Sequence, residues 1–238
     1  MKPNQSFNSS KKNQIEKMFD SISGKYDFLN RLITFGNDIK WRKKIFPIAK
    51  KNNPKKILDI ATGTADVALE LSKIEDSEIT GIDISNKMLD LGRKKIKIRL
   101  LSNKISLECE DAENLPYSKN SFDLVTISFG VRNFQNLENG LKESNRVLKK
   151  NGVLIILETS VPKNFLINFI YILFIRLYIP FISSIFSKNV SAYSYLQKSA
   201  EKFLSGEKFI SVLKKCGFKK INTYPQMLGA TSIYTANK

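Results

Sequence analysis

The sequence predicts an α/β protein whose mostly parallel sheet is covered by helices on both faces. From Lys55 onward, short apolar runs alternate with segments of helical spacing, and this alternation is typical of parallel strands joined by crossover helices. The stretch ILDIATGTADVALEL, residues 57–71, is one such unit: an apolar run, a turn of small residues, then apolar residues at helical spacing. Two consecutive strand patterns near the C terminus predict an antiparallel ending of the sheet.

The elements of the sheet domain can be placed in order along the chain. The predicted strands lie at residues 56–61, 78–84, 105–109, 122–128, 152–158, 218–224 and 230–236. The predicted helices between them lie at residues 65–73, 86–98, 137–149 and 206–216. Ligands of such sheets bind beyond the carboxyl ends of the strands, so polar residues at these ends are the first candidates for a site.

The N-terminal segment has a different pattern. Residues 11–51 predict three short helices, around residues 14–22, 26–34 and 39–50, with Gly24 and Gly36 as breaks. Because these helices precede the first strand, we expect residues 1–51 to form an N-terminal helical cap over the carboxyl edge of the sheet. Residues 52–238 would then form the sheet domain. The cap is rich in aromatic residues, which also suits an amphipathic helical core without a ligand.

The first turn predicts the type of ligand. A dinucleotide site requires the pattern G-x-G-x-x-G, but this turn has a single glycine, Gly63, followed by Thr64 and Ala65. A nucleoside without phosphates is still compatible, and the candidate is S-adenosylmethionine. The next strand pattern ends at Asp83, about 20 residues beyond the turn, where a carboxylate can accept both ribose hydroxyls. An ordinary βα turn and a solvated or helix-capping Asp83 are the alternatives.

Other polar residues follow the neighbouring strands. Asp111 and Ala112 end the third strand, where the carboxylate could hold an adenine amino group and the Ala112 N–H a ring nitrogen. SFGVRNF, residues 128–134, follows the fourth strand. Asp59 ends the first strand pattern, where it could either serve the ligand or orient the turn by accepting backbone hydrogen bonds.

Composition excludes several kinds of chemistry. The 238-residue chain has no histidine, which rules out histidine-based triads and a histidine general base. Two cysteines without metal-ligand spacing predict no metal site and suit a reducing cytoplasm. The net charge of +17 suits nucleic acid or an anionic membrane surface, although a lysine-rich composition alone would give the same excess. Residues 1–10 are polar and predict no signal peptide.

Residues 162–188 form the most hydrophobic stretch. Asn164, Asn168, Arg176 and Pro180 interrupt it, so we do not expect a membrane span. A helical hairpin or amphipathic element that covers a greasy substrate or lies on a bilayer surface fits better. A buried pair of connecting helices is the alternative.

Five segments together resemble a known family. These are FDSISGKYDFLNRLITFGNDIKWR, LDIATGTADVALEL, GIDIS followed by KML, ISFGVRNFQN, and SAYSYL followed by SGE. They are similar to the quinone-biosynthesis C-methyltransferases that act on demethylmenaquinol and its ubiquinone-pathway counterparts, from about Phe19 to the C terminus. The resemblance favours the menaquinone branch. It implies a class I S-adenosylmethionine-dependent methyltransferase fold (Rossmann-like), with a seven-stranded, mostly parallel sheet and an N-terminal helical cap.

The resemblance also implies roles for residues that bind the cofactor. Gly63 and Thr64 would meet the methionine portion of S-adenosylmethionine, and Ser128 would lie beneath the sulfonium. Asp83 would bind the ribose, and Asp111 with Ala112 the adenine. The family's first turn is often Gly-Gly-Thr-Gly, whereas residues 61–65 here read ATGTA.

The expected chemistry requires a stabilised phenolate. A sulfonium methyl reacts with a ring carbon of a hydroquinone whose ionised oxygen supplies electron density, and a dry pocket favours this charge-neutralising step. Arg132 is the candidate cation, since a guanidinium lowers the pKa of a nearby phenol; a salt bridge to an acidic neighbour is its alternative role. Asn133 could orient the same oxygen, and Tyr26 with Asn30 could close the pocket. The base is left open among a carboxylate, a tyrosine and a water.

The partners follow from this interpretation. We expect a lipophilic quinol substrate, no nucleic acid and a cytoplasmic protein, with contact to the inner face of the membrane and homo-oligomerisation as open points. Two other functions compete. An RNA methyltransferase would need a clustered basic groove with stacking aromatics, and a non-enzymatic membrane-surface protein would not need acids at three successive strand ends.

Overall fold

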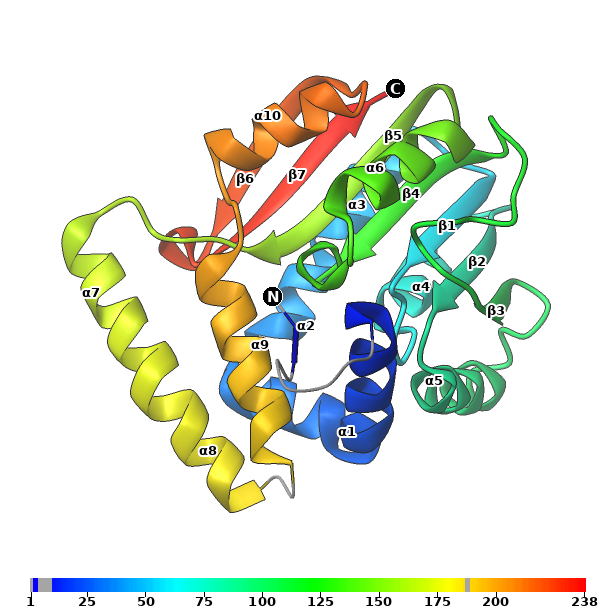
Figure 1. Cartoon of the computed structure of the whole chain (residues 1–238). Helices are drawn as coiled ribbons and strands as arrows, with labels where there is room; N and C mark the ends of the chain where they lie inside the picture. Colours follow the sequence, from blue (N-terminus) through cyan, green and yellow to red (C-terminus); the bar gives the residue numbers. More distant parts are fainter. Residues whose placement is uncertain (1, 4–9, 187–188) are drawn as a thin grey trace.

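A twisted seven-stranded sheet forms the centre of the computed structural model, which describes residues 2–3, 10–186 and 189–238 (Figure 1). The strand order is β3-β2-β1-β4-β5-β7-β6. Strands β1 to β5 are parallel, and β7 is antiparallel to both β5 and β6. The strands are β1 (Lys56–Ile60), β2 (Glu78–Asp83), β3 (Ile105–Cys109), β4 (Phe122–Ser128), β5 (Leu148–Thr159), β6 (Lys219–Gln226) and β7 (Thr231–Asn237). The predicted fold class and all seven predicted strands are confirmed.

Helices cover both faces of the sheet. The helices are α1 (Lys11–Ile33), α2 (Asn37–Lys43), α3 (Ile45–Lys50), α4 (Asp66–Leu71), α5 (Asn86–Ile98), α6 (Leu137–Val147), α7 (Phe165–Leu173), α8 (Ile179–Phe186), α9 (Val190–Lys202) and α10 (Glu207–Lys215). Short turns of other helix types lie at η1 (Val131–Asn133), η2 (Phe174–Tyr178) and η3 (Met227–Gly229).

Successive side chains along each strand point to opposite faces of the sheet, so the core has two layers. Leu154 and Ile156 of β5 pack with α6 and α10, whereas Val153, Ile155 and Leu157 pack with α3, α4 and α5 on the other face. Both sides of β5 are apolar because helices cover both. The carboxyl ends of the parallel strands point towards α1, α2 and α9 (Figure 1).

The N-terminal segment differs from the prediction. The expected helices at residues 14–22 and 26–34 are one continuous helix, α1, and Gly24 lies within it. A single glycine costs a helix only about 1 kcal/mol, and burial of Ile15, Met18, Ile22 and Leu29 against the rest of the molecule outweighs that cost. Gly36 does end the segment, with a positive φ of 73° before α2.

Replacing Gly24 with alanine should therefore stabilise the protein. A Cβ at this position would meet no atom within 4 Å, so the gain is the helix propensity of alanine, about 0.5–1 kcal/mol in the free energy of unfolding. Denaturant titration of Gly24→Ala against the wild type measures it. The paired variant Gly36→Ala should lose stability, because its φ of 73° favours glycine. A loss of stability in Gly24→Ala would contradict the continuous helix.

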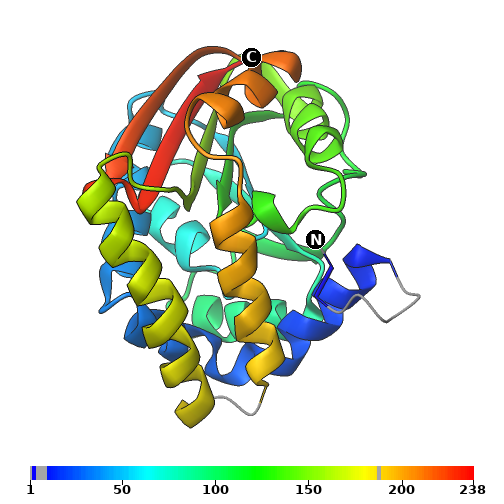
Figure 2. The same ribbon diagram turned by 60° about the vertical axis from the view of Figure 1, so that its left-hand side comes forward.

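The hydrophobic stretch is a single helical rod, and not a hairpin, which was one of the two forms expected, nor the buried pair of helices given as the alternative. Helix α7, the π-helical turn η2 and α8 follow one another without a break, and α9 runs beside the rod (Figures 1 and 2). Pro180 has no N–H for a regular helical bond, and the wider turn η2 directly before α8 accommodates it. The rod, Phe165–Phe186, is long and apolar enough to cross a membrane, with a mean hydropathy of 2.1. Only 11% of its most apolar window is buried, so it is not a core helix.

Candidate active site

Two adjoining pockets open at the carboxyl ends of the strands. The first, the nucleoside pocket, is lined by the ends of β1, β2 and β4, by the loop after β3 and by α1. The second, the apolar pocket, lies between α1, α2, η2 and α9. Tyr26 and Phe129 line both, so these two side chains form the shared wall.

The signal peptide prediction concerns residues 1–10, of which 1 and 4–9 lie outside the described residues.

Asp83 and the first turn are joined directly. The Gly63 N–H donates to Asp83 Oδ2 at 2.9 Å, and the Ser85 N–H donates to Oδ1 at 2.9 Å. These bonds hold the carboxylate beside the turn, where both its oxygens can accept further hydrogen bonds. Burial raises the pKa of Asp83 to about 6, against the lowering effect of the backbone N–H groups. A ligand hydroxyl that donates here would favour the ionised form.

The turn itself contains strained backbone. Ala61, Gly63 and Ala65 have φ values of 55°, 56° and 66°, in the left-handed region that costs about 1–2 kcal/mol for a residue with a Cβ. The small side chains keep the approach to the main chain open: Ala61 and Gly63 line the nucleoside pocket. Strain of this kind is typical of functional turns.

Asp59 orients the turn rather than facing the nucleoside pocket. Its carboxylate is buried, and it accepts hydrogen bonds from the hydroxyls of Thr62 and Thr126, both at 2.6 Å. Burial raises the pKa of Asp59 to about 6. This is the orienting alternative that the sequence left open, although hydroxyls rather than backbone N–H groups supply the bonds.

The Thr64 side chain is turned towards α1 and does not line the nucleoside pocket. Its hydroxyl lies 2.8 Å from Asp27 Oδ1 of α1, and Lys95 Nζ donates to it at 2.9 Å. Lys95 also pairs with Asp27 and Asp66, at 2.7 and 2.6 Å. Thr64 lines a smaller cavity that it shares with Gly63 and Ser128. Its side chain therefore ties α1 to the turn.

Asp111 and Ala112 line the nucleoside pocket, as expected for an adenine subsite. The Glu113 N–H donates to Asp111 Oδ1 at 2.9 Å, and Lys12 Nζ of α1 pairs with Oδ2 at 2.7 Å. Lys11 of the same helix donates to the Phe134 carbonyl oxygen. These two contacts hold the start of α1 beside the pocket. Asp111 would interact with both Lys12 and a ligand amino group.

Ser128 lies where the nucleoside pocket meets the smaller cavity behind the turn. Its hydroxyl is buried and has no hydrogen-bond partner among the described residues. Buried polar atoms are normally paired, so an unpaired one that lines a pocket marks a position for a ligand atom. The adjacent backbone is close to the turn as well: a Cβ on Gly130 would lie 2.6 Å from the Cβ of Ala61.

Tyr26 and Phe129 separate the two pockets. Burial raises the pKa of Tyr26, and the charges of Arg42 and Arg132 oppose this rise. Tyr26 is therefore a neutral hydroxyl that can donate a hydrogen bond. Phe129 follows β4 with a φ of 56°, and its ring lies 5.6 Å from Arg42 Cζ and 5.7 Å from Arg132 Cζ. Two guanidinium groups therefore converge on this wall.

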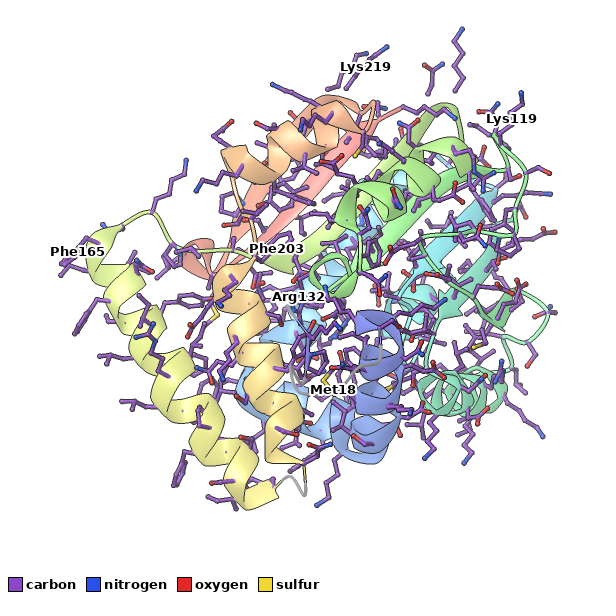
Figure 3. The ribbon with its side chains drawn as sticks, viewed as in Figure 1. Met18, Lys119, Arg132, Phe165, Phe203 and Lys219 are labelled. Atoms are coloured by element: carbon purple, nitrogen blue, oxygen red, sulfur yellow. The ribbon has the colours of Figure 1, made fainter. Side chains whose placement is uncertain are left out.

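Arg132 lines the apolar pocket and is already paired. Its NH1 lies 2.5 Å from Glu158 Oε1 and 3.0 Å from the Phe129 carbonyl oxygen. Glu158 is fully buried, and Arg132 Nε and Glu158 Oε2 have no hydrogen-bond partner among the described residues. The salt bridge to an acidic neighbour, predicted as the alternative role of Arg132, is present, and the guanidinium has further N–H groups besides the NH1 donor. Figure 3 shows Arg132 near the middle of the molecule, between α9 and α1.

Asn133 belongs to the other pocket. It lines the nucleoside pocket, its amide donates to the Phe129 carbonyl oxygen at 3.3 Å, and its Oδ1 lies 3.4 Å from the Tyr195 hydroxyl. The structure therefore does not place Asn133 beside Arg132 in the apolar pocket, where it was expected to orient the same oxygen. The short η1 turn directs the two neighbouring side chains to different pockets.

Several site residues were missed in the sequence. Glu158 lies at the end of β5, so the rule that located Asp83 and Asp111 at strand ends applied to it as well. Lys12, Asp27 and Lys95 gave no such signal, because charged residues on a helix surface are common. Asp38 and Arg42 line the apolar pocket from α2, and the family-like segment of residues 19–42 contains both of them, as well as Asp27.

The site fits S-adenosylmethionine. Asp83 offers an ionisable acceptor for a ribose, and Asp111, Ala112 and the unpaired Ser128 hydroxyl line the same pocket. The absence of a G-x-G-x-x-G turn suits a nucleoside without a pyrophosphate. Fold and site together define a class I S-adenosylmethionine-dependent methyltransferase.

Comparisons with known proteins agree. The model of the ubiE/COQ5 methyltransferase family matches residues 7–238, and the chain belongs to this family. A demethylmenaquinone methyltransferase of Bacteroides fragilis is 39% identical over 96% of this chain and 94% of its own length. A ubiquinone/menaquinone biosynthesis C-methyltransferase of Geotalea daltonii is 40% identical over 94% of this chain and 96% of its own. The family suggested by the five sequence segments is confirmed, as is S-adenosylmethionine as methyl donor.

Solved structures share the fold at low identity. A SAM-dependent methyltransferase from Aquifex aeolicus superposes with a TM-score of 0.57 at 16% identity, covering 77% of this chain and 81% of its own. The [4+2]-cyclase SpnF superposes with a TM-score of 0.60 at 16% identity, covering 95% and 96%. Because a protein titled as a cyclase has the same fold, the fold by itself does not define the reaction.

Proposed function

We propose that this protein transfers a methyl group from S-adenosylmethionine to a ring carbon of a reduced polyprenyl naphthoquinone, converting demethylmenaquinol to menaquinol. The observation that carries the proposal is the apolar pocket, which is lined by Arg132, the partner of buried Glu158, and shares the Tyr26 and Phe129 wall with the nucleoside pocket. A flat aromatic ring with a polar oxygen is the type of ligand that such a pocket would accept.

The residues around the apolar pocket would prepare the substrate for this reaction. S-adenosylmethionine supplies an electrophilic methyl group. Arg132 would hold the ionised ring oxygen, and its charge lowers the pKa of a phenol beside it. Glu158 fixes the orientation of the guanidinium through NH1. Tyr26, at the shared wall, would align the ring with the donor, and alignment of two reactants supplies several kcal/mol.

Tyr171, Tyr193 and Tyr195 are poor candidates for the proton acceptor. Burial raises the pKa of Tyr195 to about 12 and also raises the pKa values of Tyr171 and Tyr193. All three are therefore protonated at neutral pH and cannot accept a proton. A carboxylate or a water molecule remains as the acceptor.

Charge at the mouth of the nucleoside pocket argues against RNA as the substrate. Glu110, Asp111 and Glu113 line that pocket, and Lys12 is the one basic side chain among the described residues that line it. An RNA methyltransferase would need a basic groove there. The benzoquinol of the ubiquinone pathway is the closer alternative, because one relative's name includes both pathways.

A transfer assay tests the proposed function. The purified chain is incubated with S-adenosylmethionine labelled in its methyl group and with reduced demethylmenaquinone, the demethylated benzoquinol or RNA. We expect label in the lipid extract of the naphthoquinol reaction, at a higher kcat/KM than for the benzoquinol. Label found only in RNA, or in no acceptor, would refute the proposal.

We further propose that the rod α7–η2–α8 lies on an anionic bilayer. Its outer face exposes large apolar side chains, among them Phe165, Phe169, Leu177 and Phe181, and Phe165 points away from the molecule at the end of the rod (Figure 3). Its inner side contributes Phe174, Ile175 and Ile179 to the apolar pocket, so a substrate tail would pass directly from lipid to the pocket. Ile175 and Ile182 are buried, which favours a surface position over a span.

Vesicle binding tests this position. We expect the chain to sediment with vesicles of anionic phospholipid, and the double variant Phe165→Asp/Phe169→Asp to bind at least about tenfold more weakly, because each buried phenyl ring contributes about 1.5–3 kcal/mol. The matched control Ile98→Asp/Leu100→Asp alters two apolar residues at the end of α5 that are more exposed than Phe165 and Phe169, and it should bind normally. Equal binding by all three proteins would contradict the proposal, as would a stable dimer that buries the rod.

A further inference from the structure

The apolar pocket contains a second buried ion pair that the reaction described so far does not use. Arg42 NH1 lies 2.6 Å from Asp38 Oδ2, and both side chains are at most 12% exposed. Both residues line the pocket from α2. Burial of two charges is costly and is seldom needed for stability, so a pair at the wall of a binding pocket points to a ligand.

The two pairs converge on one place. Arg42 approaches the Phe129 ring to 5.6 Å and Arg132 approaches it to 5.7 Å, measured from Cζ to the ring centroid. Arg42 comes from the cap and Arg132 from the loop after β4. A ring bound in this pocket therefore meets the guanidinium of Arg132, and also the guanidinium and the carboxylate of the Arg42–Asp38 pair.

The carboxylate of Asp38 retains capacity to accept a hydrogen bond. Arg42 occupies Oδ2, whereas Oδ1 lies 3.0 Å from the Thr34 hydroxyl. That hydroxyl has one hydrogen and also lies 2.8 Å from the Asn30 carbonyl oxygen. Each carboxylate oxygen has two lone pairs, so Oδ1 can accept from a ligand hydroxyl.

We propose that Asp38 selects the reduced form of the substrate ring by accepting a hydrogen bond from its second hydroxyl group. This inference depends on the proposed function. A hydroquinone has two ring oxygens: the one beside the methylated carbon must ionise, next to Arg132, and the other keeps its hydrogen. The oxidised ring has the same shape but only acceptor oxygens, and one of them would face the carboxylate. Two acceptors in contact repel, and the buried oxygen is left unpaired.

Such selection has a purpose in the reaction. Only the reduced ring can form a phenolate, so a bound quinone occupies the site without reacting. An apolar pocket cannot distinguish two flat rings of nearly equal size by shape. A charged acceptor that requires a donor provides the discrimination, and Arg42 balances its charge when the pocket is dry.

Binding of the oxidised ring tests the inference directly. Trp41 is the only tryptophan and lines the apolar pocket, so its fluorescence reports a 2-alkyl-1,4-naphthoquinone bound in the presence of S-adenosylhomocysteine. We expect Asp38→Asn, whose amide can donate to a carbonyl oxygen, to bind this quinone at least about tenfold more tightly than the wild type. Asp90→Asn, an exposed acid paired with Arg93, is the control and should resemble the wild type.

A second variant avoids an unpaired buried charge. Asp38→Asn/Arg42→Gln removes both charges together, and S-adenosylhomocysteine binding verifies that it is folded. We expect tighter quinone binding here too and, in Asp38→Asn, a rise in KM for the quinol that exceeds the fall in kcat. Quinone affinities equal to the wild type in both variants would overturn the proposal. So would a collapse of kcat at unchanged KM, which would make Asp38 the proton acceptor. A wild type that methylates no quinol would instead refute the proposed function.

Discussion

Asp83→Ala should bind S-adenosylmethionine about 100-fold more weakly than the wild type. The carboxylate would accept both ribose hydroxyls, and hydrogen bonds to a charged group contribute about 1.5 kcal/mol or more each. The variant also removes the acceptor for the Gly63 and Ser85 N–H groups, which loosens the first turn. Calorimetric titration measures the affinity. Asp83→Asn, which keeps one acceptor oxygen, should lie between the two, and Asp90→Ala should bind normally.

The same carboxylate should make cofactor binding depend on pH. The pKa of Asp83 in the ligand-free protein is raised to about 6 by burial, and the ribose hydroxyls require the ionised form. Affinity should therefore be constant above this pKa and fall as the pH decreases through it, approaching a tenfold loss per pH unit. Asp83→Asn should not show the transition. If the wild type and Asp83→Asn have the same pH profile, Asp83 does not bind the ribose.

Arg132→Lys should lose about 100-fold in kcat while its affinity for S-adenosylmethionine is unchanged. Lysine keeps the positive charge but not the planar fork, which can bind Glu158 through NH1 and still offer further N–H groups. Loss of one preoriented donor to a developing charge costs about 100-fold to 1000-fold in turnover. Steady-state kinetics with the reduced quinone, together with calorimetry for the cofactor, separates the two effects.

The matched control for this variant is Arg93→Lys, which alters an exposed arginine paired with Asp90. It should keep the turnover of the wild type. The prediction for Arg132 fails if Arg132→Lys turns over normally, or if its cofactor affinity falls in step with its kcat. The second outcome would mean that Arg132 maintains the structure of the nucleoside pocket and does not stabilise the phenolate.

Patterns along single segments accounted for much of the fold. The seven strands and their helices were predictable because each apolar run has its own period and length, and these depend on neighbouring residues. The strand-end rule also located Asp83, Asp111, Ala112 and Ser128 at one pocket. The continuous α1 was not predictable from its glycine, since the compensating contacts are made with α9 and other distant segments.

Contacts between distant segments decided the rest of the site. Arg132 was expected to meet an acid or a phenolate, and only the folded chain shows that buried Glu158 is its partner. Asn133 lines the nucleoside pocket, whereas its neighbour Arg132 lines the apolar pocket, because the two side chains leave the η1 turn in different directions. Thr64 is drawn away from that pocket by Asp27 and Lys95.

The sequence by itself determined the layered sheet, the position of the cofactor turn and the family, because these depend on local periodicity and on short motifs. The tertiary structure decided which charges are paired and which pocket each side chain faces. Arg42 of α2 and Arg132 of the loop after β4 both lie near the Phe129 ring, and Arg132 pairs with Glu158 of β5. Segments so far apart in the chain come together only when the core is formed, so no local pattern could predict their contact.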